Sequence, residues 1–176
     1  VWLCALILCF GPAVYVHAER SAGQTVDDTT LATSVKYILT RAENVPVGSI
    51  NVEVYKGIVQ LSGFIHKEAQ KVAALSSVRE VNGVVATNDG LVLTDVPRSL
   101  GHFIDDQTIQ AKLKAKIGDS LGVGTAVSVV THVRNGAVIV AGFVGNRKEI
   151  NTVVETAKSI SGVTKVHNRL LVRQAD

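Results

Sequence analysis

One internal repeat limits what this chain can fold into more than any other feature of its sequence. Three motifs recur 78 or 79 positions further along the chain: 26–31 as 104–109, 61–64 as 140–143, and 81–84 as 160–163. In the last pair, Val81-Asn82-Gly83-Val84 returns as Ile160-Ser161-Gly162-Val163. Because two copies are too few for a solenoid, the repeat predicts a tandem pair of independent domains.

Each copy predicts the same order of elements, α-β-β-α-β. Apolar residues at helical spacing follow an acidic pair, two alternating strands follow the helix, and a second helix and a closing strand complete the copy. Tight turns at Lys56-Gly57 and Asn135-Gly136 join the first two strands, and Asn-Gly is a strong hairpin signal. The predicted fold class is α+β: two tandem α-β-β-α-β domains, each a three-stranded mixed sheet with two helices on one face.

Local signals predict where the helices begin and end. The acidic pairs Asp27-Asp28 and Asp105-Asp106 are expected to cap the N-terminus of the first helix in each copy. Gly83 and Gly162 are expected to adopt positive φ at the C-caps of the second helices. Residues 96–103 lack an amphipathic pattern and are predicted to link a first domain at 27–95 to a second at 104–173, each folding on its own.

The first eighteen residues carry no Lys, Arg, Asp or Glu, and their apolar run breaks at Gly11-Pro12. A transmembrane helix needs about 20 apolar residues, so this shorter run is typical of a secretory signal peptide. We expect residues 1–18 to be removed after Ala18, leaving 19–26 as a short N-terminal segment of an exported protein. Two alternatives are lipidation at Cys9, which bulky preceding residues disfavour, and a buried N-terminal helix.

One stretch of the sequence matches a catalytic motif, but its predicted structural context does not fit that motif. Gly118-Asp119-Ser120-Leu121-Gly122 matches the G-x-S-x-G pattern of hydrolases, whose serine must follow a strand and precede a helix. Here the pattern predicts a helix that ends at Gly118, then a loop, then a strand whose alternation begins at Val127. We therefore predict no catalytic residue at Ser120.

Other chemistry has no support in the sequence. The histidines show no i,i+4 pairing of the kind that binds zinc: His17, His66, His102, His132 and His167. Both cysteines, Cys4 and Cys9, fall in the predicted signal peptide. No glycine-rich loop leads from a strand into a helix with phosphate-binding spacing. We expect no metal site, no cofactor and no enzymatic activity.

Charge is distributed unevenly between the copies. Residues 27–95 carry 6 basic and 8 acidic side chains, a net charge of −2, whereas residues 105–176 carry 10 basic and 6 acidic, a net charge of +4. The second copy is therefore the one suited to an anionic surface.

The first predicted helix of the second copy concentrates this charge. Lys112, Lys114 and Lys116 flank an apolar stripe of Ile109, Leu113 and Ile117. On a bilayer the stripe could face the acyl chains while the lysines reach phosphates. Alternatively, the stripe faces the domain core and the lysines only solvate the helix. The candidate lipid-binding residues are Lys112, Lys114, Lys116 and, more weakly, Arg147 and Lys148.

The assembled motifs resemble the BON domain. In the second copy they are the acidic helix start Asp105-Asp106, the strand from Val138 to Phe143, and the turn and strand from Ile160 to Val172. The resemblance covers the whole predicted mature chain. It implies an envelope location, phospholipid binding, and a role in osmotic tolerance or outer-membrane integrity. The first copy departs from this pattern: it has Asn88-Asp89-Gly90-Leu91 where the second copy has His167-Asn168-Arg169-Leu170. We therefore do not expect the two copies to bind lipid with equal affinity.

Two hypotheses about function follow. The leading one is a non-enzymatic periplasmic protein that binds an anionic phospholipid membrane surface, with envelope proteins as further partners. The alternative is a soluble periplasmic stress protein that acts through protein–protein contacts or chaperone-like binding, which the lack of an evident exposed apolar patch disfavours. Nucleic-acid binding would suit the net charge of +3, but export would separate the protein from its target, and aromatic residues do not alternate with the basic ones.

Overall fold

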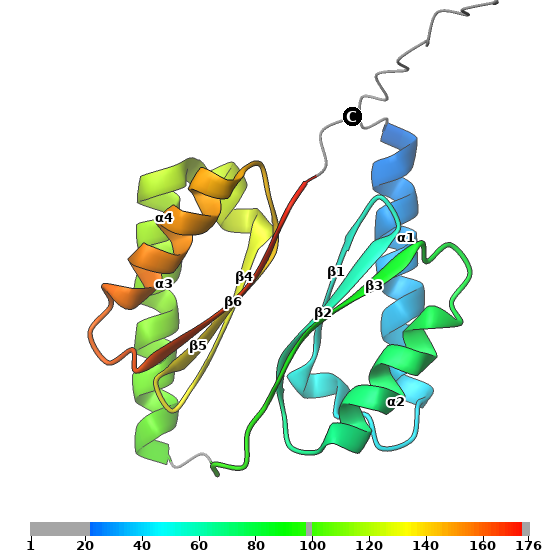
Figure 1. Cartoon of the computed structure of the whole chain (residues 1–176), viewed down its shortest axis with the longest axis horizontal. Coiled ribbons are helices and arrows are strands. Elements are labelled where there is room, and N and C mark those ends of the chain that lie inside the picture. Colours follow the sequence, from blue (N-terminus) through cyan, green and yellow to red (C-terminus); the bar gives the residue numbers. More distant parts are fainter. Residues whose placement is uncertain (1–21, 98–99, 174–176) are drawn as a thin grey trace, which may run out of the picture.

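A computed structural model describes residues 22–97 and 100–173 as two α-β-β-α-β units (Figure 1). The elements of the first unit are α1 (Ala22–Arg41), the 3-10 helix η1 (Val47–Ser49), β1 (Asn51–Tyr55), β2 (Ile58–Ile65), α2 (Glu68–Arg79) and β3 (Ala86–Leu93). The second unit contains α3 (Leu100–Ser128), β4 (Val129–Arg134), β5 (Ala137–Val144), α4 (Arg147–Lys158) and β6 (Lys165–Val172). The element order predicted from the repeat is confirmed.

Each unit is one three-stranded mixed sheet covered by two helices on one face, as predicted. The strand orders are β1-β2-β3 and β4-β5-β6. In each sheet the first two strands are antiparallel and the last two are parallel. Between helices and sheet lies an aliphatic core, in which Leu113 and Val140 of the second unit have no exposed surface. Burial of such side chains is the main force that holds the helices on the sheet.

The hairpin turns have the predicted geometry. Lys56 and Gly57 have φ of 50° and 75°, and Asn135 and Gly136 have φ of 49° and 75°. Two successive residues with positive φ form the type I′ turn that matches the twist of a two-residue hairpin. Gly83 and Gly162 also have positive φ, 94° and 92°, although they lie in the turn after the helix.

The acidic pairs do not cap helices, and this prediction was wrong. α1 begins at Ala22 and α3 at Leu100, so Asp28 and Asp106 lie inside their helices. The Asp106 carboxylate instead accepts hydrogen bonds from Asn135 N at 3.0 Å and Gly136 N at 3.1 Å. Asp28 accepts the equivalent bonds from the Lys56 and Gly57 N–H groups. The second acid of each pair therefore ties the helix to the hairpin turn.

α3 is longer than predicted. The helix continues through Gly118 as far as Gly122, whose non-helical backbone (φ 80°, ψ 162°) forms a kink, and a second helical segment follows to Ser128. Leu121 and Ala126, on either side of the kink, pack against the core of the second unit, so burial of apolar surface favours helix here over the predicted loop. Val127, predicted as the start of a strand, accordingly belongs to the helix.

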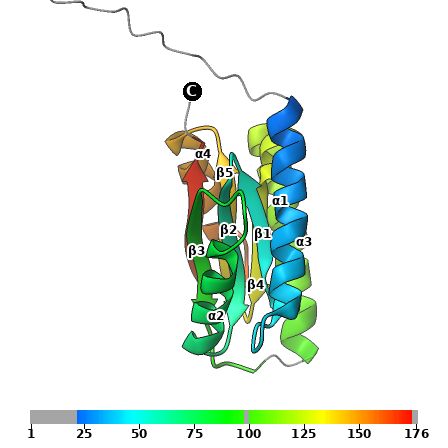
Figure 2. The ribbon, with the colours of Figure 1, turned by 90° about the vertical axis from the view of Figure 1, so that its right-hand side faces the viewer.

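The two sheets pack face to face, so the molecule has four layers, with the helices outside and the sheets inside (Figures 1 and 2). The faces that the helices leave free meet in a small apolar cluster of Phe64, Ile139 and Ala141. The equivalent strands β2 and β5 contact each other across this interface. The repeat predicted two domains but no contact between them.

Polar contacts make this interface specific. Gln60 has no exposed surface; its Oε1 accepts from Gly142 N at 2.7 Å and its Nε2 donates to Arg169 O at 2.6 Å. Ser62 Oγ lies 3.2 Å from His132 Nε2 across the same interface. Because these polar groups are paired, their burial costs little and fixes the register of the two sheets.

Candidate functional site

The exposed surface of α3 carries the three predicted lysines, since Lys112, Lys114 and Lys116 are all exposed. The apolar stripe between them faces inward: Ile109, Leu113 and Ile117 are 5%, 0% and 1% exposed and belong to the core. These side chains cannot reach a bilayer in the folded protein. The prediction that this stripe could face acyl chains is therefore wrong, because the sheet already covers it.

The lysines do not form one cluster. Lys116 Nζ lies 3.4 Å from Ser159 Oγ, just beyond the end of α4, so this side chain crosses between the two helices. Lys114 lies on the other flank, where its charge reaches His132 of β4. The structure thus places two cationic borders along α3, one toward α4 and one toward β4.

Between these borders α3 presents a surface on which three apolar residues lie among exposed polar ones such as Thr108. Ile104, Ala111 and Ala115 are exposed and are spaced by seven and four residues, which places them on one face of the helix. We call these three residues the outer face of α3. Lys112 and Lys114 flank it on opposite sides, because two residues correspond to about 200° of helical rotation. Sequence reasoning missed this face because it began the helix at Asp105.

The N-terminal end of α3 is the most apolar part of this surface. Ile104 is 67% exposed and Phe103 is 42% exposed, and Val96 of the preceding segment is 50% exposed. Exposed large apolar side chains that gather at one end of an element are typical of an interaction site. The signal available in the sequence was the apolar pair Phe103-Ile104 directly before the acidic pair.

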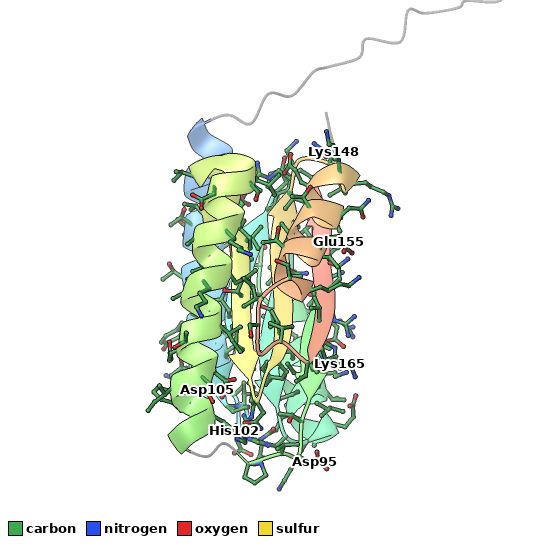
Figure 3. All side chains as sticks on the ribbon, turned by 90° about the vertical axis from the view of Figure 1, so that its left-hand side faces the viewer. Asp95, His102, Asp105, Lys148, Glu155 and Lys165 are labelled. Carbon is green, nitrogen blue, oxygen red and sulfur yellow. The ribbon has the colours of Figure 1, made fainter. Side chains whose placement is uncertain are left out.

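Arg147 and Lys148 lie apart from this end of the domain. They form the first turn of α4, where Asn146 Oδ1 caps the helix by accepting from Glu149 N at 3.0 Å. Figure 3 shows Lys148 at one end of the domain and His102, the neighbour of Phe103, at the other. Positive charges in the first turn of a helix interact unfavourably with the helix dipole. The stability of α4 therefore does not explain the presence of Arg147 and Lys148.

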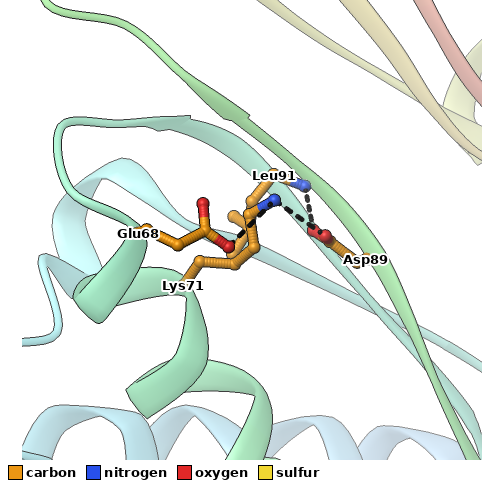
Figure 4. Close-up of polar contacts among 4 residues, drawn as sticks. All are labelled: Glu68, Lys71, Asp89 and Leu91. Carbon is orange, nitrogen blue, oxygen red and sulfur yellow. Dashed lines mark hydrogen bonds and ion pairs between the residues drawn. The ribbon is translucent and has the colours of Figure 1, made fainter.

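The first domain neutralises part of its charge internally. Lys71 of α2 pairs with Asp89 of β3 at 3.1 Å and lies 3.8 Å from Glu68 (Figure 4). The positions 79 residues later hold Arg147, Ile150 and Asn168. Loss of the Lys71–Asp89 pair leaves the net charge unchanged, whereas the replacement of Glu68 by Arg147 makes the second copy more positive.

Two histidines of the second domain are held neutral. Burial, and then the charge of Lys114, lower the pKa of His132 to about 4. Burial, and then Lys165 and Arg169, also lower the pKa of His167. Neither imidazole adds a cation to this surface at neutral pH. Within residues 22–97 and 100–173, no three His, Cys, Asp or Glu side chains are grouped so that they could hold a metal ion.

Ser120, the serine of the G-x-S-x-G sequence match, lies inside α3. A nucleophile elbow needs a strand immediately before the serine, and helix precedes it here. The predicted signal peptide at 1–18, with Cys4, Cys9 and His17, lies outside the described residues. Among the described helices, none combines the length and the apolar character needed to span a bilayer.

Comparison with known proteins identifies the fold. The family model described as "BON domain" matches residues 27–95 and again residues 105–174. The chain belongs to the BON-domain family. The two matched segments are the two α-β-β-α-β units, so the molecule is a tandem pair of BON domains packed sheet to sheet.

Named proteins are similar to this chain in sequence or structure. Osmotically-inducible protein Y of Escherichia coli (strain K12) is 29% identical over 153 residues, which cover 86% of this chain and 75% of that protein. Outer membrane lipoprotein DolP of Haemophilus influenzae is 33% identical over 81 residues, 46% of this chain and 42% of its own. Among solved structures, the C-terminal domain of CdsD, a structural protein of the type III secretion system of Chlamydia trachomatis, aligns with 84% of this chain and 67% of its own. The TM-score of this alignment is 0.34 and the sequence identity is 16%.

Proposed function

We propose that this tandem BON protein is a non-enzymatic protein of the periplasm that binds anionic phospholipid through its second BON domain. Two relatives support the location and the setting, since one is named for osmotic induction and the other is an outer membrane lipoprotein. Support in osmotic stress or outer-membrane integrity is the role that these names suggest.

The observation that carries the proposal is the outer face of α3 between its lysines. Ile104 supplies apolar surface that can enter the headgroup region of a bilayer, and Phe103, about 100° around the helix, adds exposed apolar surface on the Lys114 side. Lys112 and Lys114 border this surface on both sides, and their long side chains can reach phosphates while the helix lies flat. This arrangement replaces the buried stripe as the membrane-facing surface.

The lysines are expected to supply most of the attraction. Each cation near an anionic surface contributes about 1 kcal/mol, and the effect decays over a Debye length of about 8 Å at physiological salt. Loss of Lys112, Lys114 and Lys116 should therefore cost up to about 3 kcal/mol, a hundredfold or more in affinity. Arg147 and Lys148 lie in the first turn of α4, at the end of the domain opposite His102, and we expect them to contribute less.

Sedimentation with liposomes of graded anionic lipid content tests the proposal. The triple variant Lys112→Gln, Lys114→Gln, Lys116→Gln should fold normally, because all three side chains are exposed, and should lose binding to anionic liposomes. A matched control, Lys36→Gln, Lys158→Gln, Lys165→Gln, removes the same charge from other exposed positions and should retain most of the binding. Binding by the parent should weaken steeply as salt is raised.

Two outcomes would overturn the proposal. Equal binding by the folded triple variant and the parent would mean that α3 is not the lipid site. If the parent ignores anionic liposomes even at low salt, lipid binding itself fails, and protein partners in the envelope become the better explanation of the exposed apolar end of α3.

A further inference from the structure

The first domain has a groove of about 820 Å³ between α1 and the end of α2. Sites for small molecules usually measure about 300–1,000 Å³. Its lining includes Tyr37, Ile38 and Arg41 from α1, and Glu80, Val81 and Asn82 from the turn that follows α2. This groove lies in the other domain from the proposed lipid surface.

An exposed aromatic ring forms one wall of the groove. Tyr37 is 58% exposed, which is unusual for an aromatic side chain on a helix of a folded domain. Arg41 lies against the ring: its Nη1 donates to the Tyr37 hydroxyl at 3.0 Å and its guanidinium lies 5.6 Å from the ring centroid. A ring restrained by these contacts offers a flat surface to a ligand.

The polar groups of the groove are complementary in kind. Arg41 can only donate hydrogen bonds and Glu80 can only accept them. In the described part of the chain these two side chains make no ion pair with each other. Asn82 can both donate and accept, and partly buried Ile38 and Val81 supply apolar surface beneath. A ligand rich in hydroxyl groups satisfies all of these at once, because each hydroxyl both donates and accepts.

Other classes of ligand fit less well. An acyl chain would leave the polar walls without partners. A phosphate or carboxylate would meet the Glu80 charge, and a nucleotide would find a single arginine and no loop of backbone N–H groups. A sugar ring has one apolar face and a polar rim, which matches an aromatic wall with hydrogen-bonding groups around it.

The second domain has lost these features at the same positions. Its residues are Ala115 for Tyr37, Asp119 for Arg41, Ser159 for Glu80 and Lys116 for Ile38. Lys116 reaches Ser159 at 3.4 Å and so crosses the space between the helices. The aromatic wall and the paired polar groups are therefore specific to the first domain.

From this geometry we infer that the groove of the first domain binds a neutral oligosaccharide, with Tyr37 as the stacking surface and Arg41 and Glu80 as hydrogen-bonding partners. The two domains then recognise different components, a carbohydrate in the first and an anionic lipid surface in the second. The carbohydrate site rests on none of the lysines of α3, so it stands or falls independently of the lipid proposal.

Titration of the whole protein with chitotriose and with maltotriose, followed by amide chemical shifts in NMR spectra, tests this inference. We expect saturable shifts at α1 and the turn after α2 with at least one of the two sugars. Tyr37→Ala should weaken that binding about tenfold, while Tyr37→Phe should retain most of it, because the ring remains. Liposome sedimentation of Tyr37→Ala should match the parent.

The matched control is Asp119→Ala, which changes the position equivalent to Arg41 in the second domain and should leave sugar binding unchanged. The inference is overturned if neither sugar gives saturable shifts, or if Tyr37→Ala, shown to be folded, binds as tightly as the parent. Shifts at this groove with a hexapeptide of mixed Lys and Glu, but with neither sugar, would also overturn it and identify a peptide groove.

Discussion

The buried carboxylate of Asp106 accepts hydrogen bonds from two successive backbone N–H groups, those of Asn135 and Gly136. A two-residue hairpin loop leaves these groups without partners in the strand ladder, and each unpaired buried donor costs about 1–3 kcal/mol. Asp28 has the same role in the first domain. One side chain thus fixes both the turn and the position of the helix above it.

Replacing Asp106 by Ala should lower the free energy of unfolding of the second domain by about 2–4 kcal/mol, because two charge-assisted hydrogen bonds are lost. Its exposed neighbour provides a matched control: Asp105→Ala should change stability by less than about 0.5 kcal/mol. Urea unfolding of both variants checks this. Equal effects of the two substitutions would show that the acidic pair acts through general helix charge.

His132 should make stability depend on pH. Its folded pKa of about 4 lies below its ordinary value of 6.5, so the unfolded chain binds a proton more readily between these values. The stabilisation is complete above pH 6.5 and is lost as pH falls toward 4, by up to about 3 kcal/mol. His132→Gln should flatten urea-derived stability across this range. The exposed His66→Gln serves as the control, and an unchanged slope in His132→Gln would contradict the assignment.

At the scale of elements, the continuation of α3 beyond Gly118 gives the sharpest test. A Cβ at Gly118 would lie 3.8 Å from Ala126 Cβ, which is an ordinary contact. Gly118→Ala should therefore stabilise the protein by up to about 1 kcal/mol through helix propensity. Gly122, with φ of 80° and ψ of 162°, occupies a region open only to glycine, so Gly122→Ala should destabilise by about 1–3 kcal/mol. Thermal unfolding measures whether each variant is more or less stable than the parent. A Gly118→Ala variant that is less stable than the parent would support a helix that ends at Gly118.

The elements themselves were predictable because their signals are local. The Asn135-Gly136 turn and the alternation on both sides of it depend on neighbouring residues, and the structure follows them. The end of α3 was not predictable in this way. Gly118 resembles a helix stop, yet the break in the helix lies four residues later at Gly122, and Leu121 and Ala126 on either side of it pack on a core built from distant residues.

The candidate site was predictable only in part. The exposure of Lys112, Lys114 and Lys116 follows from the helical pattern alone. Which apolar face of α3 is buried depends on the sheet beneath it, and that contact brings together residues far apart in the chain. For the same reason, the groove around Tyr37 could not be read from sequence, because α1 and the turn after α2 meet only in the fold.

At the scale of the molecule, the central strands are buried on both faces, by helices on one side and by the other sheet on the second. The run from Ala137 to Val144 is nearly all apolar, and such a run is typical of a strand covered on both faces. The sequence therefore held a signal for the contact between domains that the repeat alone did not provide.

We expect each domain to fold when the chain is cut near Arg98, because each has its own core. Each half should unfold at a lower urea concentration than the intact chain, since separation exposes Phe64, Ile139 and the Gln60 amide. Gln60→Ala in the intact chain should reduce this difference, because it leaves Gly142 N and Arg169 O unpaired. Circular dichroism of the separated halves decides the point, and two unfolded halves would mean that neither core suffices alone.

Gly90 of β3 is the position equivalent to Arg169 of β6, and the two meet at the interface. A Cβ at Gly90 would lie 3.6 Å from Arg169 Cβ, so an arginine at residue 90 would bring two cationic side chains together at the interface. A recombination event that copied the second half of the coding sequence over the first would put Arg opposite Arg, and repulsion between the like charges would weaken the packing of the two sheets. Selection on this contact would therefore disfavour such events, and the two repeats would continue to diverge in sequence while keeping the same fold.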